Sequence, residues 1–429
     1  MKKRQISAPK VVADPIYGII DIRPVLPMME TQEFQALGDK RQLGMSYLTF
    51  PSATHTRKAH SLGAYHATRK LADRWLELGF IKEDEADALS GYALYHDIGH
   101  PAFSHVVEDL CDKDNDALGL EIIRGLRGAI EEAGINYELL ESMARHENPL
   151  YLAVHDKNLG TEKLDYLERD GLATILSRPS GIDYLREHIY FIDGELAIDE
   201  KVVDNAIEAQ NFYLKMYKNV YLRKTSAIAQ RMFQKTVYYL LLAGEITKKD
   251  LPTLTDSELL GIMRLSKNPV VQELYDMLKR RELFREAIVI RPEKFANLGT
   301  ANDKAIATFG LKDDEVRKLM KSSALDQKNQ AGLGELEKKI ANIAGIPEAA
   351  VLVVPVFNPG RFQAKDVRIH KDGRISSLKE RYPAHFQNME EVAQSYIALR
   401  ICVPEKYRKQ LSDPKTAKEV LDIVMKSSA

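Results

Sequence analysis

The run from Tyr95 to His105, which reads YHDIGHPAFSH, constrains this chain more than any other stretch. It contains three of the 11 histidines, and His96 is followed directly by Asp97. An imidazole beside a carboxylate is a mixed nitrogen and oxygen ligand set, which suits Mn, Fe, Zn or Co better than an ion that takes only oxygen ligands. For any one of these residues, a hydrogen-bonded core histidine beside a helix end is the simpler interpretation. Together with His60 upstream, the run favours a metal site.

Helical periodicity leads up to this run. Apolar residues recur at helical spacing over 86–93, which predicts a mostly buried helix that ends at His96. The acidic residues 83–85 suit the start of that helix, where the helix dipole favours negative charge. Gly99 and Pro101 then stop the helix. Thr56 can begin a second helix that carries His60.

A second chemical cluster lies in the segment TEKLDYLERD, residues 161–170. Thr161 can cap a helix there. At 3.6 residues per turn, Lys163, Tyr166 and Asp170 share one face, while the two leucines face the packing side. On spacing alone, an ordinary amphipathic surface helix explains this pattern as well as a binding face does.

Composition fits a large cytoplasmic enzyme. A chain of 429 residues that is 45% hydrophobic can bury one or two cores. The balance of 61 basic against 62 acidic residues gives no overall attraction to nucleic acid or a membrane, so we expect neither as a partner. Only two cysteines occur, Cys111 and Cys402, which argues against a disulfide framework. We find no secretory signal and no apolar run that could span a bilayer.

The sequence predicts a mainly α fold, with a helical core followed by a smaller C-terminal α+β lobe. Residues 16–22 suit a short hairpin or edge strand, and residues 118–242 read as almost entirely helical. Segments rich in β-branched and aromatic residues follow residue 285, at 287–290, 351–354, 367–369 and 396–401, with a hairpin turn at 371–373. We predict a core over 1–285, a lobe over 286–410 and a tail over 411–429.

These motifs occur together in one known family. The pattern His60, His96-Asp97, His100 and His105 resembles the HD-domain metal-dependent phosphohydrolases. Its surroundings resemble the deoxynucleotide triphosphohydrolase branch, which includes the sterile-alpha-motif/HD and dGTPase-like enzymes. The stretches that carry this resemblance, in the family's order, are DPIYG (14–18), FQAL (34–37), RQLG (41–44), FPSATHTR (50–57), the run described above, KLDYLERD (163–170) and GRFQ (360–363).

The resemblance implies an activity and a site. Relatives of this branch hydrolyse deoxynucleoside triphosphates to deoxynucleoside and triphosphate with a divalent metal ion, which the residues do not narrow beyond Mn, Fe, Mg, Zn or Co. The implied metal ligands are His60, His96, Asp97 and Glu162. The implied catalytic residues are His100, His105 and Arg57. The implied substrate contacts are Gln42, Arg57, His105, Lys163, Tyr166 and Asp170.

The chain departs from the family pattern at two places in the site. Glu162 stands where the family has an aspartate as fourth ligand, and its side chain is one methylene longer. Residues 114–116 read DND where relatives place a His-Glu pair. His146 is followed by a glutamate, but it lies too near Glu162 to align well with that pair, so we treat it as a weak candidate.

The resemblance also implies a homo-oligomer, a dimer or a tetramer, and relatives are often activated by a guanine nucleotide near FQAL (34–37). Gly38 replaces the arginine expected to recognise guanine, and Glu30 replaces an aspartate. We therefore predict that guanine-specific activation is absent or altered. Two alternatives to triphosphate hydrolysis remain: hydrolysis of another nucleotide phosphate ester, and a degenerate nucleotide-binding regulator.

Overall fold

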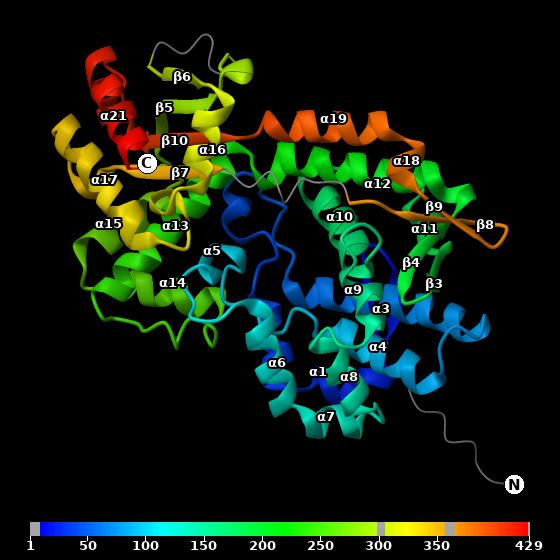
Figure 1. The fold of residues 1–429 in the computed structure, drawn as a ribbon. Helices are drawn as coiled ribbons and strands as arrows, with labels where there is room; N and C mark the ends of the chain where they lie inside the picture. The colour runs from blue at the N-terminus through cyan, green and yellow to red at the C-terminus, as the bar shows by residue number, and fades with distance from the viewer. Residues whose placement is uncertain (1–8, 298–304, 357–364, 428–429) are drawn as a thin grey trace, which may run out of the picture.

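The computed structural model describes residues 9–297, 305–356 and 365–427 (Figure 1). The predicted GRFQ motif at 360–363 lies outside the described residues, because the second gap spans 357–364. The fold is mainly α, as predicted, with a larger helical part and a smaller lobe built on a β-sheet.

The helical part is organised around three packed helices. These are α3 (Arg57–Glu77), α4 (Glu83–Tyr95) and α10 (Thr161–Thr174), and α3 contacts both of the others. Thr56 caps α3, and acidic residues open α4, both as predicted. Gly160 takes the N-cap position of α10, so Thr161, predicted as the cap, is instead the first helical residue. The Thr161 hydroxyl lies 2.6 Å from that of Thr68 on α3 and joins the two helices.

Shorter helices enclose this group. The core beneath them is built from aromatic and aliphatic side chains, with Trp75 of α3 and Leu89 of α4 fully buried. The surrounding helices are α1 (Leu26–Met29), α2 (Gln32–Ala36), α5 (His105–Glu108), α6 (Asn115–Gly125), α7 (Arg127–Glu132), α8 (Tyr137–Ala144), α9 (Leu152–His155) and α11 (Ile182–Arg186).

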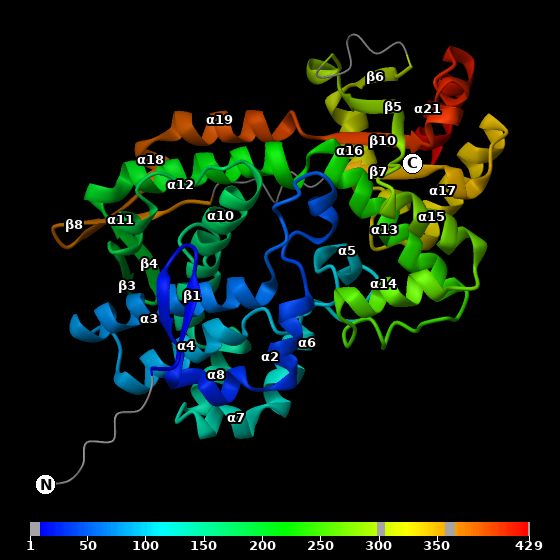
Figure 2. The same cartoon turned by 180° about the vertical axis from the view of Figure 1, so that it is seen from behind.

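The predicted N-terminal hairpin is present. Strands β1 (Val11–Asp14) and β2 (Gly18–Asp21) pair antiparallel, and Gly18 has a φ of +75°, a value that favours glycine at the turn. Figure 2 shows the hairpin beside α3, which β2 contacts.

The sheet of the smaller lobe has the strand order β6-β5-β10-β7. Its strands are β5 (Arg285–Pro292), β6 (Ala307–Leu311), β7 (Leu352–Val356) and β10 (Ala398–Val403). Helices α16 (Asp313–Lys321), α17 (Gln330–Ala344) and α21 (Pro414–Lys426) pack into one core with this sheet. A second core joins the sheet to the helices α13 (Lys224–Leu242), α14 (Asp256–Leu265) and α15 (Pro269–Lys279).

A third group of strands corrects the prediction that residues 118–242 are almost entirely helical. Strands β3 (Ile189–Ile192) and β4 (Glu195–Asp199) form a hairpin, and β4 pairs in parallel with β8 (Arg368–Lys371). Strand β9 (Arg374–Ser377) completes this sheet through the predicted turn at 371–373. The pairing partner of β4 lies about 170 residues away in sequence, so local periodicity carries no signal for it.

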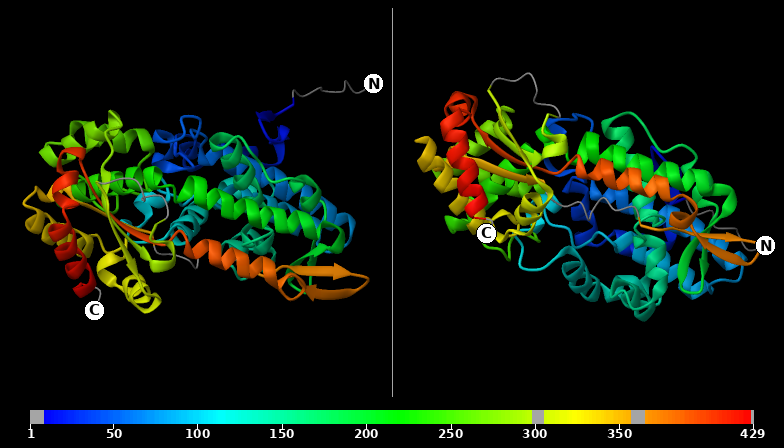
Figure 3. Two further views of the ribbon diagram at one scale, coloured as in Figure 1. Left: turned by 90° about the horizontal axis from the view of Figure 1, so that it is seen from above. Right: turned by 45° about the horizontal axis from the view of Figure 1, so that its top comes forward.

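The chain therefore returns to the helical part late in its sequence. After β9, α18 (Leu378–Arg381) and α19 (Pro383–Gln394) follow, and α19 runs beside α12 (Val203–Met216), as Figure 3 shows. The remaining short helix, α20 (Glu405–Leu411), precedes α21. Residues 411–429, predicted as a tail, include α21, because buried apolar residues recur there at helical spacing.

Both cysteines are free thiols, which agrees with the predicted lack of a disulfide framework. Among the described residues, no helix combines the length and apolar character needed to cross a bilayer.

Candidate metal centre

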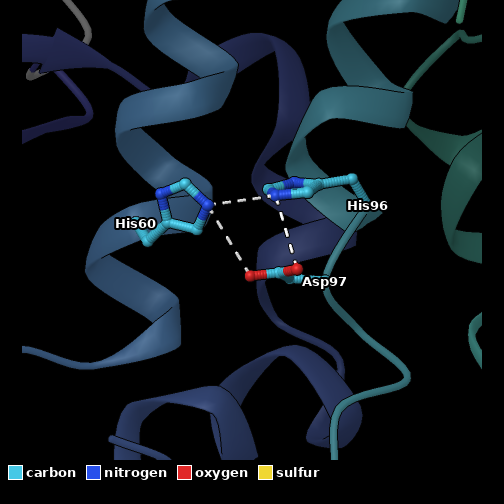
Figure 4. Close-up of side chains that lie close together, drawn as sticks. All are labelled: His60, His96 and Asp97. Atoms are coloured by element: carbon cyan, nitrogen blue, oxygen red, sulfur yellow. Dashed lines mark hydrogen bonds and ion pairs between the residues drawn. The ribbon is translucent and has the colours of Figure 1, made fainter. Parts of the chain in front are cut away.

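Three predicted ligands meet where α3 faces the end of α4 (Figure 4). Nε2 of His60 lies 3.2 Å from Nε2 of His96, and these atoms lie 3.7 and 3.5 Å from the nearer oxygens of Asp97. Glu162, in the first turn of α10, brings its Oε2 to 3.4 Å from Nε2 of His96. We call these four residues the metal cluster.

Hydrogen bonds around the cluster fix which ring nitrogens carry protons. Nδ1 of His60 lies 2.7 Å from the Asp165 carboxylate, and Nδ1 of His96 lies 2.7 Å from the carbonyl of Ala93. Both partners are acceptors, so each Nδ1 carries the proton and, in the neutral ring, each Nε2 presents a lone pair. Two lone pairs that face each other at 3.2 Å repel unless a proton or a cation lies between them.

The separations fit a single ion. Two ligand atoms about 2.1 Å from one metal ion lie about 3.0–3.4 Å apart when the angle between them is right or tetrahedral. Nε2 of His96 lies 3.2 Å from His60 and 3.4 Å from Glu162, within that range, and the distances to Asp97, 3.5 and 3.7 Å, lie slightly above it. The two imidazoles and two carboxylates of the cluster therefore fit a divalent transition ion in both donor type and spacing.

The electrostatics of the cluster favour a cation. Burial acts to raise the pKa of Asp97, but the Arg57 guanidinium together with His96 and His100 outweighs burial and holds that pKa well below its usual range. Burial likewise opposes ionisation of Glu162, but His155 and His96 together outweigh burial and lower the pKa of Glu162 to about 2. Both carboxylates are therefore ionised at neutral pH, inside a site that excludes most water.

Behind His60 lies a buried ion-pair network. Asp165 accepts from His60 on one side and from Arg169 on the other, at 3.0 Å, and Arg169 also pairs with Asp14 at 2.9 Å. Gly63 allows this approach, since a Cβ on it would lie 2.1 Å from the Asp165 carboxylate. Asp165 thus orients the His60 ring and fixes its tautomer, as carboxylates behind metal-binding histidines do.

This network gives a first prediction. We expect Asp165→Asn to weaken metal affinity about 10–100-fold, because the ring of His60 loses its charged partner. Asp14→Asn removes a carboxylate from the same arginine without touching His60, so it should lower stability and leave metal affinity near that of the wild type. Chelator competition followed by metal analysis measures both. Equal metal affinities in the two variants would contradict a role of Asp165 in orienting the ligand.

A pocket of about 330 Å³ opens onto the cluster. Nine predicted site residues line it, namely Gln42, Arg57, His60, His96, Asp97, His100, His105, Glu162 and Tyr166. The other lining residues are Glu108, Asp114, Asn115, Asp116 and His155. Two predicted residues, Lys163 and Asp170, do not line it.

Arg57 and His100 flank the cluster. The Arg57 guanidinium donates to Asp97 at 2.6 Å and to the Ser104 hydroxyl at 2.7 Å, so it is held rigidly at the pocket wall. Burial, reinforced by Arg57, lowers the pKa of His100 to about 3, so this ring is neutral at physiological pH. Nε2 of His100 lies 3.2 Å from Asp97, and its Nδ1 is buried without a hydrogen-bond partner among the described residues.

His105 sits at the open side of the pocket, and its side chain is 64% exposed. Its Nδ1 lies 2.7 Å from the Glu108 carboxylate, and its ring lies edge-on to that of His100. Burial acts to raise the pKa of Glu108, but the hydrogen bond and charge interaction with His105, together with His100 and Asn115, outweigh burial and lower that pKa to about 2. Glu108 therefore fixes the proton on Nδ1 and leaves Nε2 of His105 available to a ligand.

Lys163 and Asp170 are engaged elsewhere. The Lys163 amine donates to the carbonyl of Lys157 and lies 3.5 Å from the centre of the Tyr213 ring, and burial lowers its pKa to about 7. Both oxygens of Asp170 are occupied, one by His55 and one by the Tyr221 hydroxyl, each at 2.7 Å. Their predicted roles in phosphate and sugar binding remain predictions, and each would require these contacts to rearrange.

Sequence reasoning missed His155 and Glu108. His155 ends α9, and its Nδ1 lies 2.9 Å from Oε2 of Glu162. The weak candidate His146 is exposed, stacks on Tyr151 and does not line the pocket. Glu108 lies three residues after His105, a spacing that places two side chains on one helix face and could have identified it. No local spacing ties His155 to the cluster.

Comparison with known proteins agrees with this geometry. The HD domain matches residues 57–178, and an HD associated region matches residues 182–310. The chain belongs to the HD-domain family. The first of these matches spans the whole metal cluster, and membership supports a metal-dependent hydrolase.

Two curated proteins are similar to this chain over about two thirds of its length. The chain is 28% identical to an uncharacterized protein of Methanocaldococcus jannaschii over 65% of this chain and 59% of that protein. It is 26% identical to the deoxynucleoside triphosphate triphosphohydrolase SAMHD1 homolog of Dictyostelium discoideum, over 66% of this chain and 62% of that protein. The chain thus matches about three fifths of the length of each.

A solved structure shares the fold. A phosphohydrolase of Bacteroides thetaiotaomicron superposes with a TM-score of 0.68 at 22% identity, and the match covers 92% of this chain and all of that chain. The fold is therefore shared well beyond the HD domain itself.

Proposed function

We propose that this protein hydrolyses deoxynucleoside triphosphates to deoxynucleoside and inorganic triphosphate. The observation that carries the proposal is the metal cluster, whose unprotonated acceptors converge beside a pocket that also presents Arg57, His100 and His105. The named activity of the Dictyostelium relative supports the choice of substrate.

The reaction consumes one water. The water oxygen forms a bond to the α-phosphorus, the bond from that phosphorus to the 5′-oxygen breaks, and the departing 5′-oxygen takes up a proton. A divalent ion held by the cluster would polarise a phosphate oxygen and lower the pKa of the attacking water. Arg57, fixed against Asp97, offers a rigid guanidinium to the phosphates.

His100 and His105 can carry out the proton transfers that this reaction needs. His100 is neutral and lies closest to the cluster, so its unpartnered Nδ1 can accept a proton or a hydrogen bond near the attacked phosphorus. His105 is exposed and is oriented by Glu108, which suits contact with the phosphates or protonation of the leaving oxygen. Gln42 has a buried Oε1 without a hydrogen-bond partner among the described residues, which suits a sugar hydroxyl.

Product analysis tests the proposal. Purified protein is incubated with each deoxynucleoside triphosphate, singly and mixed, with Mg, Mn or Co, and the products are separated by ion-pair chromatography. We expect deoxynucleoside and triphosphate in equal amounts. Release of monophosphate or diphosphate instead would reject this reaction, and activity only in the mixture would indicate a nucleotide activator.

The charge of the pocket lining favours a second candidate function, hydrolysis of a less charged phosphate ester. The lining holds five carboxylates, on Asp97, Glu108, Asp114, Asp116 and Glu162, but only one guanidinium and no lysine. A phosphate monoester carries less charge than a triphosphate and would be repelled less strongly. Hydrolysis of nucleoside monophosphates, with inorganic phosphate as product, is therefore the alternative that the same chromatogram detects. Assembly into a dimer or tetramer remains a prediction.

A further inference from the structure

Glu162, the fourth predicted ligand of the metal cluster, is contacted by two histidines, His155 and His96. Oε2 of Glu162 lies 2.9 Å from Nδ1 of His155 and 3.4 Å from Nε2 of His96. His96 commits its Nδ1 proton to the Ala93 carbonyl, so its Nε2 cannot donate to the glutamate unless the ring is charged. The hydrogen bond from His155 is thus the contact that fixes this oxygen of Glu162.

His155 is itself rigidly placed. Its side chain is 21% exposed, and its ring lies edge-on to His96 at 5.7 Å and against Tyr92 at 5.6 Å between ring centres. The turn that follows leads directly into α10, because Asp156 accepts the backbone N–H groups of residues 158 and 159, each at 2.8 Å. Gly160 makes this turn possible, since a Cβ on it would lie 2.3 Å from the carbonyl of Val154.

The extra methylene of Glu162 makes such support necessary. A glutamate has one more rotatable bond than an aspartate, so its carboxylate can occupy more positions at the cluster and loses more conformational freedom when it binds an ion. A donor fixed on a second helix end removes most of those positions in advance. The hydrogen bond from His155, at 2.9 Å, supplies this support.

We propose that His155 is a positioning residue of the metal site: it holds the Glu162 carboxylate against His60, His96 and Asp97, so that a glutamate can complete the ligand set. This inference rests on the proposed metal-dependent function, but it does not depend on which phosphate ester is hydrolysed.

A double-mutant cycle on the metal affinity of the full chain tests this role. The affinity for Mn or Co is measured by chelator competition, without substrate, for His155→Ala, Glu162→Asp and the double variant. We expect His155→Ala to lower affinity about 10–100-fold in the wild-type background. In the Glu162→Asp background, His155→Ala should lower the metal affinity by less than about threefold, because the shorter side chain needs less positioning.

Two further variants separate positioning from a general loss of structure. His155→Gln keeps a hydrogen-bond donor and should retain most of the affinity that His155→Ala loses. His146→Ala removes a ring that lies 5.7 Å from His155 but does not line the pocket, and it should leave affinity unchanged. The thermal midpoint of each metal-free variant reports on folding.

Each outcome decides the proposal. Equal losses in the two backgrounds would overturn it, because His155 would then act independently of Glu162. Unchanged affinity in His155→Ala, or no binding of Mn or Co by the wild type, would also overturn it. If affinity depends on His155 as expected but no deoxynucleoside triphosphate is cleaved, the positioning role stands and the proposed substrate falls.

Discussion

Replacement of His96 by alanine is expected to abolish metal binding and to lower kcat/KM by about 10³-fold. A bound divalent ion contributes several kcal/mol to stabilisation of the charge that develops on a phosphate. At about 1.4 kcal/mol for each factor of ten, loss of the ion costs about three orders of magnitude. His96 is the central ligand of the cluster, since its Nε2 lies within 3.5 Å of His60, Asp97 and Glu162.

The measurement combines metal analysis of the purified protein with product chromatography. The side chain of His96 is fully buried, so His96→Gln serves as a second variant that leaves a smaller cavity. His188→Ala is the control, because that ring hydrogen-bonds to the carbonyl of Tyr184 in α11 and does not line the pocket. Full metal content in both His96 variants would contradict the assignment of this residue as a ligand.

Most residues of the candidate site could be predicted from the sequence, because they lie close together along the chain. Asp97, His100 and His105 follow one helix end, so their spacing already places them together. The sequence grouped His60 with them as a candidate metal site, but their distance from His60 depends on how α3 packs against α4, which helical spacing does not give. The geometry now brings these residues into one pocket, while their chemical roles remain proposals.

Contacts between elements explain what the sequence did not predict. The helical reading of residues 118–242 overlooked β3 and β4, whose sheet is completed by β8, far along the chain. Periodicity placed Lys163 and Asp170 on one face with Tyr166, but it could not show that Tyr213 and Tyr221 of a later segment engage them. His155 was missed for the same reason.

The second prediction with a large expected effect concerns the turn after Asp97. The φ of Gly99 is not positive, so a glycine is not needed here for its conformational freedom. A Cβ on Gly99 would lie 2.2 Å from the carbonyl oxygen of Asn115 and 2.3 Å from the backbone nitrogen of Gly119, both in α6. Backbone atoms of a helix cannot move aside as the end of a side chain can, so α6 and the turn would have to separate.

Gly99→Ala is therefore expected to destabilise the protein by about 3 kcal/mol, at the upper end of the cost of overpacking. It should also lower kcat/KM about 100-fold, because a displacement of about 1 Å in a reacting group costs that much, and His100 is the next residue. Urea unfolding and product chromatography measure the two effects.

Gly119→Ala is the matched control for this contact. It adds the same methyl group from the opposite side, and its Cβ would lie 3.6 Å from the nitrogen of Gly99, an ordinary van der Waals distance. Because alanine favours a helix interior over glycine by about 1 kcal/mol, this variant should be as stable as the wild type or more stable. If Gly99→Ala matched Gly119→Ala in stability, the turn would not depend on close contact with α6. A large loss of both stability and kcat/KM in Gly99→Ala, but not in Gly119→Ala, would show that this contact holds His100 beside the metal cluster.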